Sequence, residues 1–171
     1  RRGFCASRQR LAIACNPELL IADEPTTALD VTIQAQVLNM MRRLRRELGS
    51  SMLMITHDLG VVADICDYVA IMYAGEIVEY GTVQDIFEGE NHHPYTEGLL
   101  KSIPVIGEKR ERLYSIEGMV PSQKNYPKGC RFAPRCEYAD ERCNQCKPEL
   151  YTSPDGRRVR CWKYEEAQDH E

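Results

Sequence analysis

Long hydrophobic runs, an excess of positive charge and repeated or low-complexity tracts are all missing from this 171-residue sequence. Its longest apolar runs, LLIA at 19–22 and VAIMYA at 69–74, fall far short of the roughly 20 residues that a membrane-spanning helix needs. Any membrane role is therefore expected to act through a partner. The formal net charge of -4 argues against nonspecific nucleic-acid binding by the whole chain. A hydrophobic content of 43% is typical of a globular protein rather than a disordered or fibrous one.

A signal peptide is also missing, because the opening residues RRGFCASRQR contain no apolar central region. We therefore expect a reducing, cytosolic environment, in which clustered cysteines bind metal more often than they form disulfides. Five of the eight cysteines lie near the C-terminus: Cys130, Cys136, Cys143, Cys146 and Cys161. From the residues alone, their irregular spacing favours loops around a metal centre, with zinc at the CxxC pair of Cys143 and Cys146 as the first choice.

Residues 11–101 alternate between strand and helix patterns, whereas the chain after about residue 120 is rich in Pro, Gly, Cys and charge. The apolar runs at 19–22 and 51–56 predict buried parallel strands. A hairpin with its turn at 74–76 is expected next. The sequence therefore predicts an α/β fold with a largely parallel sheet and an antiparallel pair near its end.

Helical spacing of apolar residues after the first strand predicts an amphipathic helix with Asp30 as its N-cap and Gly49 as its C-terminal stop. The arginines within 42–46 could form a nucleic-acid patch, but a solvated face that complements the helix C-terminus is the simpler interpretation. Shorter helices are expected at 58–66, 82–89 and 95–103.

Polar side chains follow both predicted parallel strands. Asp23 and Glu24 end the first strand, and His57 and Asp58 follow the second. The carboxyl ends of parallel strands meet at one edge of a sheet, where α/β folds bind their ligands. Adjacent acids can divide two tasks, one holding a metal ion and the other orienting a water, so this edge has the residues that phosphoryl transfer requires.

These motifs resemble a known family. LLIADEPTTALD at 19–30 and MLMITHDLGVVADICDYVAIMYAGEIVEYG at 52–81 are similar to the ATP-binding subunits of ABC transporters, and within them to those of oligopeptide, dipeptide and nickel importers. The resemblance implies the C-terminal part of a P-loop NTPase nucleotide-binding domain over residues 1–104. A C-terminal extension would then occupy 105–171, with a cysteine-rich module at about 126–164.

The resemblance also implies roles for individual residues. Asp23 would act on the Mg²⁺ of bound ATP, Glu24 would polarise the attacking water, and His57 would contact the γ-phosphate. Ala28, Leu29 and Asp30 would fall on the D-loop, which touches a second ATPase subunit across the dimer interface.

The family's C-terminal extension, similar to GCRFAPRC and the later cysteines here, binds a [4Fe–4S] cluster. The positions that match are Cys130, Cys136, Cys143 and Cys161, and four thiolates suffice for such a cluster. Cys146 is extra, so its substitution should leave the cluster in place, whereas substitution of Cys136 should remove it.

The phosphate-binding loop GxxxxGK[ST] does not occur in these 171 residues, and neither does a Q-loop or an LSGGQ-like segment before Arg8, Gln9 and Arg10. Phosphoryl transfer depends on positioning, so Asp23 and Glu24 would have no nucleotide placed before them. We expect negligible ATP hydrolysis by this chain alone, and uncovered apolar surface that favours aggregation.

Two hypotheses from different classes follow. The first is part of the ATP-hydrolysing subunit that energises a peptide importer, at the cytoplasmic face of the cell membrane. Its partners would be a second ATPase subunit, membrane permease subunits and, indirectly, an extracytoplasmic substrate-binding protein. The second is a non-catalytic module that binds iron–sulfur or zinc beside a vestigial ATPase half. Nucleic-acid binding is disfavoured by the acidic net charge.

Overall fold

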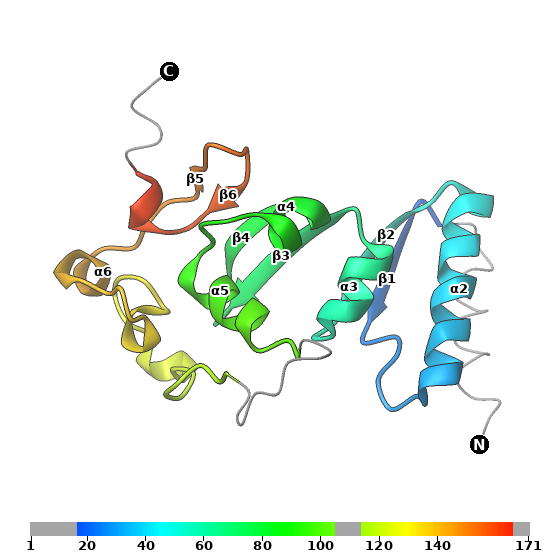
Figure 1. The fold of residues 1–171 in the computed structure, drawn as a ribbon, viewed down its shortest axis with the longest axis horizontal. Helices are drawn as coiled ribbons and strands as arrows, with labels where there is room; N and C mark the ends of the chain where they lie inside the picture. The colour runs from blue at the N-terminus through cyan, green and yellow to red at the C-terminus, as the bar shows by residue number, and fades with distance from the viewer. Residues whose placement is uncertain (1–16, 105–113, 166–171) are drawn as a thin grey trace. The chain divides into compact units, whose positions relative to one another are not determined.

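The computed structural model describes residues 17–104 and 114–165, whose fold is drawn in Figure 1. Two compact units make up the chain, one that ends at Cys66 and one that begins at Asp67, and both contain helices and strands. Within the described ranges, no helix combines the length and the hydrophobicity that crossing a membrane requires. The predicted features before residue 17, Arg8, Gln9 and Arg10 among them, lie outside the described residues.

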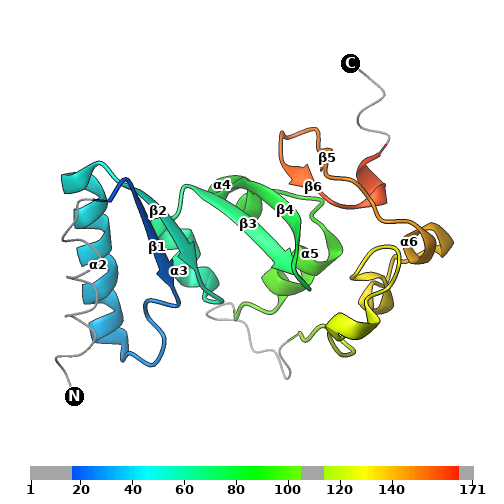
Figure 2. The same cartoon turned by 180° about the vertical axis from the view of Figure 1, so that it is seen from behind.

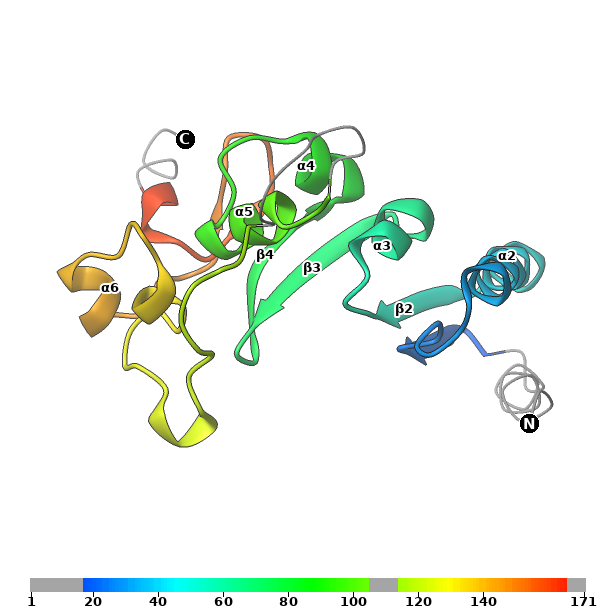
Figure 3. The ribbon, with the colours of Figure 1, turned by 60° about the horizontal axis from the view of Figure 1, so that its bottom comes forward.

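The first unit is built on two parallel strands, β1 (Leu19–Asp23) and β2 (Ser51–Ile55). Helix α2 (Val31–Leu48) connects them, and α3 (Leu59–Ile65) follows β2. Figure 3 shows both helices on the same side of the strand pair. The parallel pairing and both helices agree with the sequence prediction.

The ends of α2 are those that the sequence predicts. The Asp30 side chain accepts a hydrogen bond from the Ile33 backbone N–H at 2.9 Å, which satisfies one of the donors that a helix N-terminus leaves unpaired. At the other end, Gly49 adopts the left-handed conformation with φ 62°, which glycine reaches without steric cost.

The two faces of the parallel pair differ. Leu20 and Met52 line a small pocket together with Leu44 and Leu48 of α2. The alternate residues point the other way, and between 50% and 61% of each is exposed: Leu19, Ile21, Leu53 and Ile55. The expectation that these strands are buried on both faces is therefore wrong for one face, because the described helices cover only the other.

The second unit contains an antiparallel hairpin, β3 (Tyr68–Tyr73) and β4 (Glu76–Thr82), with Ala74 and Gly75 in the left-handed region at the predicted turn. Helices α4 (Val83–Glu88) and α5 (Pro94–Lys101) lie on one face of this hairpin, as Figures 1 and 2 show from opposite sides.

Two short strands from the C-terminal region extend the hairpin. Strand β6 (Arg158–Val159) pairs with β4, and β5 (Tyr151–Thr152) pairs with β6, giving the order β3-β4-β6-β5. Every pairing in this four-stranded sheet is antiparallel. Among the described residues, parallel pairing is thus limited to β1 and β2, and the prediction of a largely parallel sheet does not extend to the second unit.

The β4–β6 pairing also means that the compact units divide at a different place from the predicted domains. The expected division between residues 104 and 105 separates two regions of sequence, whereas β4 and β6 come from both sides of it and share one sheet. The remaining elements of the C-terminal region are short: η1 (Gln123–Asn125), η2 (Ala133–Arg135), α6 (Glu141–Gln145) and η3 (Trp162–Tyr164).

Candidate functional site

The carboxyl ends of β1 and β2 lie level with each other. Asp23 pairs with Ile55 in the strand register, and the Glu24 backbone N–H then donates to the Ile55 carbonyl at 2.8 Å. Glu24 has φ 46°, a conformation that non-glycine residues seldom adopt, so the chain turns sharply after the strand. The predicted acid pair and the residues after β2 are therefore at one edge of the sheet.

The side chains of Glu24 and His57 are in contact at this edge. His57 Nδ1 lies 2.8 Å from Glu24 Oε1, and the Thr27 hydroxyl donates to the other carboxylate oxygen. The hydrogen bonds from Thr27 and from His57 lower the pKa of Glu24, and the hydrogen bond to Glu24 raises the pKa of His57. Both shifts favour an ionised carboxylate beside a protonated imidazole. Asp23 is exposed at the adjacent position.

Two other acidic residues near this edge, Asp30 and Asp58, cap helices. Asp30 caps α2, and Ala28 before it is in the left-handed region with φ 59°. Asp58 caps α3 by accepting from the Gly60 and Val61 N–H groups, and it also accepts from the Gln34 side chain at 3.3 Å. Of the polar residues after β2, His57 is thus the one that reaches the acid pair.

A second candidate site is a cavity of about 280 Å³ in the C-terminal region. We call it the cysteine cavity, because four of its lining residues are Cys130, Cys136, Cys143 and Cys161. These are the four positions singled out by the sequence resemblance. Cys146, the extra cysteine, is exposed and does not line the cavity.

Close backbone packing brings two of these cysteines together. The Cys130 backbone N–H donates to the Cys143 carbonyl at 2.8 Å. A Cβ on the preceding residue, Gly129, would lie 2.3 Å from that same carbonyl oxygen, so only glycine fits there. Asp140 caps α6 by accepting from the Cys143 N–H at 2.7 Å, which fixes the other side of the contact.

The thiols of this cavity are reduced and weakly acidic. No disulfide joins any cysteines within the described ranges. Burial raises the pKa of the Cys130, Cys136 and Cys143 thiols, and it raises that of Cys161 to about 11. A metal centre that binds here must therefore displace protons.

Within residues 17–104 and 114–165, no group of three or more His, Cys, Asp or Glu side chains is arranged to hold a metal ion. The four cysteines are among the residues that line one cavity, but they do not form such a group. A single zinc ion needs its ligand atoms about 2.0–2.3 Å from the metal, which this arrangement does not provide.

The cations near the cavity are not the predicted ones. Arg142 and Lys163 line it, and each also stacks on an aromatic ring, Arg142 at 3.6 Å over Trp162 and Lys163 at 3.6 Å over Tyr138. From the sequence, partial compensation of thiolate and cluster charge is favoured over a nucleic-acid surface for Arg131, Arg135, Arg157, Arg158 and Arg160. Four of them mainly bind elsewhere: Arg131 pairs with Glu76, Arg135 binds two backbone carbonyls, Arg157 is buried with Glu79, and Arg160 binds two carbonyls. Arg160 alone among these four lowers the pKa of one of the cysteines, Cys130.

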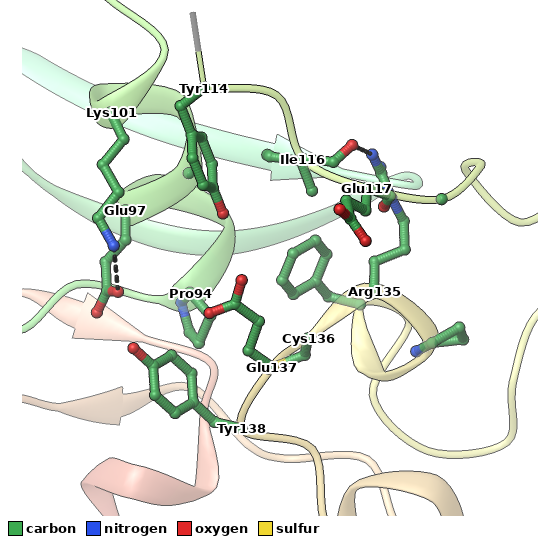
Figure 4. A pocket seen from close by; sticks show the side chains of 14 residues that line it. Pro94, Glu97, Lys101, Tyr114, Ile116, Glu117, Arg135, Cys136, Glu137 and Tyr138 are labelled. Atoms are coloured by element: carbon green, nitrogen blue, oxygen red, sulfur yellow. Dashed lines mark hydrogen bonds and ion pairs between the residues drawn. The ribbon is translucent and has the colours of Figure 1, made fainter. Parts of the chain in front are cut away.

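Figure 4 shows a neighbouring cavity of about 370 Å³, into which Tyr114 and Glu137 point. An ion pair between Glu97 and Lys101 lies at its edge, with 3.8 Å between the charged atoms. Cys136 lines this cavity as well as the cysteine cavity. The two cavities therefore adjoin each other at Cys136.

The two histidines before α5 are hydrogen-bonded core residues. The sequence alone favours surface or satisfied core positions for His92 and His93, and both are buried, with exposed fractions of 5% and 1%. His92 Nδ1 lies 2.9 Å from Glu79 Oε1, while the backbone N–H of His93 donates to Glu79 Oε2 at 3.0 Å. The signal that could have found them is the pair of histidines directly before Pro94 at a helix start.

His93 also lines the cysteine cavity. Its imidazole packs against Phe132, with 5.7 Å between the ring centroids, and Phe132 in turn contacts Tyr73 and Tyr95. Burial lowers the pKa of His93 to about 4, so the ring is neutral at physiological pH.

The chain is similar to several known proteins. Residues 78–143 match the family described as the oligopeptide/dipeptide transporter, C-terminal region. The oligopeptide transport ATP-binding protein AppD of Bacillus subtilis is 57% identical over 91% of this chain and 47% of its own length. The corresponding protein OppD of Haemophilus influenzae is 51% identical over 91% of this chain and 49% of its own.

Among solved structures, CbiO1 of Clostridium perfringens, part of the ABC transporter complex CbiONQ, is 31% identical over 48% of this chain and 34% of that chain, with a TM-score of 0.43. The chain spans about half the length of the curated relatives that it matches.

Proposed function

Since this chain is homologous to the ATP-binding subunits of oligopeptide and dipeptide transporters and carries their C-terminal region, we propose that it forms part of the subunit that binds and hydrolyses ATP to drive peptide import. The observation that carries this proposal is the 57% identity to AppD over 91% of the chain. The contact between Glu24 and His57 at the ends of β1 and β2 supports it independently.

The proposal gives each residue at this edge a task. Asp23 would hold Mg²⁺, Glu24 would polarise the water that attacks the γ-phosphate, and His57 would contact that phosphate. The exposed positions of Asp23 and Glu24 suit these tasks, because both need an ionised carboxylate that solvent and ligand can reach. Bound ATP and Mg²⁺ would supply the phosphoryl group and the charge that neutralises it.

These 171 residues contain no phosphate-binding loop, so the chain alone should bind nucleotide poorly and hydrolyse almost none. In the assembled transporter we place it at the cytoplasmic membrane face, against permease subunits and a second ATPase subunit. Asp30 would lie at the contact with that second subunit. An extracytoplasmic substrate-binding protein would act with it indirectly.

We further propose that Cys130, Cys136, Cys143 and Cys161 hold a [4Fe–4S] cluster. Four cysteine thiolates are the ligand set that such a cluster uses, and a cluster fills a space between its ligands where a single ion would need them to converge. The observation that supports this proposal is that all four cysteines line the cysteine cavity of about 280 Å³. A bound cluster would supply a redox-active and charged centre. Its main expected effect is to stabilise the fold by cross-linking the loops that carry the four cysteines.

A chimera tests the first proposal. The chain would replace the matching half of AppD in Bacillus subtilis cells that lack AppD, and peptide-dependent growth and ATP hydrolysis by the purified chimera would be measured. Glu24→Gln should reduce hydrolysis by about 10²–10⁴-fold, the usual contribution of a general base. Glu47→Gln, on the exposed face of α2, is the matched control and should leave hydrolysis unchanged. Full hydrolysis by the Glu24→Gln chimera would reject the assigned role.

Iron and sulfide analysis tests the cluster. Anaerobically purified wild-type chain should contain iron and acid-labile sulfide, and Cys136→Ser should lose both. Cys146→Ser is the control, because Cys146 lies outside the cysteine cavity. Zinc in place of iron, or equal iron in both variants, would contradict the ligand assignment.

A further inference from the structure

The cavity of Figure 4 has no task in the proposed function. Its volume of about 370 Å³ is within the range of roughly 300–1,000 Å³ that small-molecule sites occupy. Residues of α5 and of the segments 114–118 and 132–138 line it, and all of them belong to the second unit. Pro94, Ile116 and Phe132 give part of its wall an apolar surface. A ligand here requires neither nucleotide nor a cluster, so its binding is independent of the proposed function.

Carboxylates outnumber cations in the lining of this cavity. Glu97, Glu117 and Glu137 line it, against Lys101 and Arg135. Lys101 is the counter-ion of Glu97, with 3.8 Å between the charged atoms. Among the residues that the structure describes, neither Glu117 nor Glu137 is in an ion pair. Two side chains of the lining therefore carry negative charge that no described cation neutralises at close range.

The guanidinium of Arg135 binds other acceptors. Its Nε and Nη2 donate to the backbone carbonyls of Glu117 and Ile116, each at 2.8 Å, and its Nη1 lies 3.4 Å from the Tyr73 hydroxyl. None of these acceptors is a carboxylate. Arg135 therefore holds the segment 114–118 in place and leaves Glu137 without a counter-ion.

Two tyrosine rings line the same cavity, and each has a lysine ammonium over it. Lys101 Nζ lies 5.9 Å from the centroid of the Tyr114 ring, and Lys163 Nζ lies 3.6 Å from that of Tyr138. The face of an aromatic ring attracts ammonium and guanidinium groups, and apolar surface packs against their methylene stems. Figure 4 shows Tyr114 and Glu137 pointing into the cavity, so a cation inside it can meet both an aromatic ring and a carboxylate.

We propose that this cavity binds an organic cation, an ammonium or guanidinium group on an apolar stem, with Glu137 as its counter-ion and Tyr114 as an aromatic wall. An anion would be repelled by Glu117 and Glu137. A neutral apolar ligand would remove water from the Glu137 carboxylate without replacing its hydrogen bonds. Two sources share the required chemistry: a free alkylamine, and the lysine or arginine side chain of a peptide.

The first measurement is a titration of the full 171-residue chain with pentylammonium chloride, followed by the amide signals in 15N–1H nuclear magnetic resonance spectra. Gly98 and Gly118 line the cavity, and their amide signals should shift and reach saturation. The alcohol n-pentanol has the same stem without the charge and should cause no saturable shift. Added sodium chloride should weaken the binding of pentylammonium, because salt screens exposed charges.

Three variants assign the binding to named side chains. Glu137→Gln removes the charge and keeps the size of the side chain, so it should raise the dissociation constant of pentylammonium roughly tenfold. Tyr114→Leu keeps an apolar side chain without the ring and should raise it roughly two- to fivefold. Glu149→Gln is the matched control, because Glu149 is exposed and lines neither cavity, and it should leave the constant unchanged. Thermal unfolding verifies that all three variants are folded.

A second probe, N-acetyl-lysinamide, separates the two sources of the cation. It carries a lysine side chain on a peptide-like backbone that has no other charge. Saturable binding of this probe supports the side chain of a peptide as the ligand. Binding of pentylammonium without binding of N-acetyl-lysinamide supports a free alkylamine.

Three results would overturn the inference. One is equal binding of n-pentanol and pentylammonium, and another is equal affinity of Glu137→Gln and wild type for the cation. The third is the absence of any saturable shift at Gly98 and Gly118 with both cationic probes. None of these results bears on the proposed function, whose tests measure ATP hydrolysis, iron and sulfide.

Discussion

The guanidinium of Arg157 and the carboxylate of Glu79 form an ion pair that solvent barely reaches. Their charged atoms, Nη1 and Oε1, are 2.7 Å apart, and the two side chains are 1% and 0% exposed. Glu79 is on β4 and Arg157 comes directly before β6, so the pair joins the hairpin of β3 and β4 to a segment 78 residues further along the chain. The ion pair therefore joins the same two parts of the chain as the β4–β6 strand pairing.

Breaking this pair should destabilise the second unit. Arg157→Met leaves the Glu79 carboxylate buried without the guanidinium of its ion pair and should lower the free energy of unfolding by about 3–5 kcal/mol. Trp162, the single tryptophan, lies in this unit, so its fluorescence in a urea titration reports the change. Arg158→Met, at the exposed neighbouring position, should stay within about 0.5 kcal/mol of wild type. A similar stability for both variants would show that the pair contributes little.

Asp155, which also binds Arg157, should make a contribution to folding stability that is lost in acid. Burial alone would raise its pKa, but hydrogen bonds from Arg157 and Ser153 lower it from 3.8 to about 2. A carboxyl whose pKa is lower in the folded state stabilises the fold above its unfolded pKa and loses that effect as the pH falls through the folded value. The stability difference between wild type and Asp155→Asn should therefore shrink between pH 3.8 and about 2. A difference that stays constant across this range would contradict the shift.

The contact between Glu24 and His57 predicts a titration that nuclear magnetic resonance can follow. The hydrogen bond to Glu24 raises the pKa of His57 above 6.5. In Glu24→Gln the His57 pKa should return towards that ordinary value, because the carboxylate charge is gone. Glu47→Gln, which alters a carboxylate far along α2, should leave it unchanged. An unaltered His57 titration in Glu24→Gln would mean that the two side chains do not interact in solution.

Much of the first unit could be predicted because its signals are local. The Asp30 cap, the Gly49 stop and the strand-end position of Asp23 each depend on a few neighbouring residues. The approach of the residues after β1 to those after β2 could also be predicted, since parallel strands bring their carboxyl ends to one edge of the sheet. The contact between Glu24 and His57 is the physical result.

The second unit shows where that reasoning ends. Strands β5 and β6 have two residues each, too few for a period-2 pattern, so their addition to β4 could not be predicted. The buried position of His93 depends on Glu79 and Phe132, which are distant in sequence. The four cysteines of the cavity were found by resemblance to a family and not by spacing, because no regular interval separates them.

The exposed face of the parallel strands carries the last prediction. Leu19, Ile21, Leu53 and Ile55 are each at least half exposed and lie on neighbouring strands in register. A contiguous apolar face of this kind promotes association between copies of a chain. We therefore expect the isolated 171-residue chain to self-associate as its concentration rises.

Replacing two central residues should reduce this self-association. In the double variant Ile21→Thr, Leu53→Thr, threonine keeps the strand preference of β-branched residues while it removes apolar surface from water contact. Analytical ultracentrifugation should show a smaller concentration dependence than wild type. Val31→Thr is the control, because Val31 is 83% exposed but stands on α2, away from the strand face. The substitutions change only the exposed strand face and leave the helix-covered side, with Leu20 and Met52, intact. Equal association of the double variant and wild type would therefore mean that another surface mediates self-association.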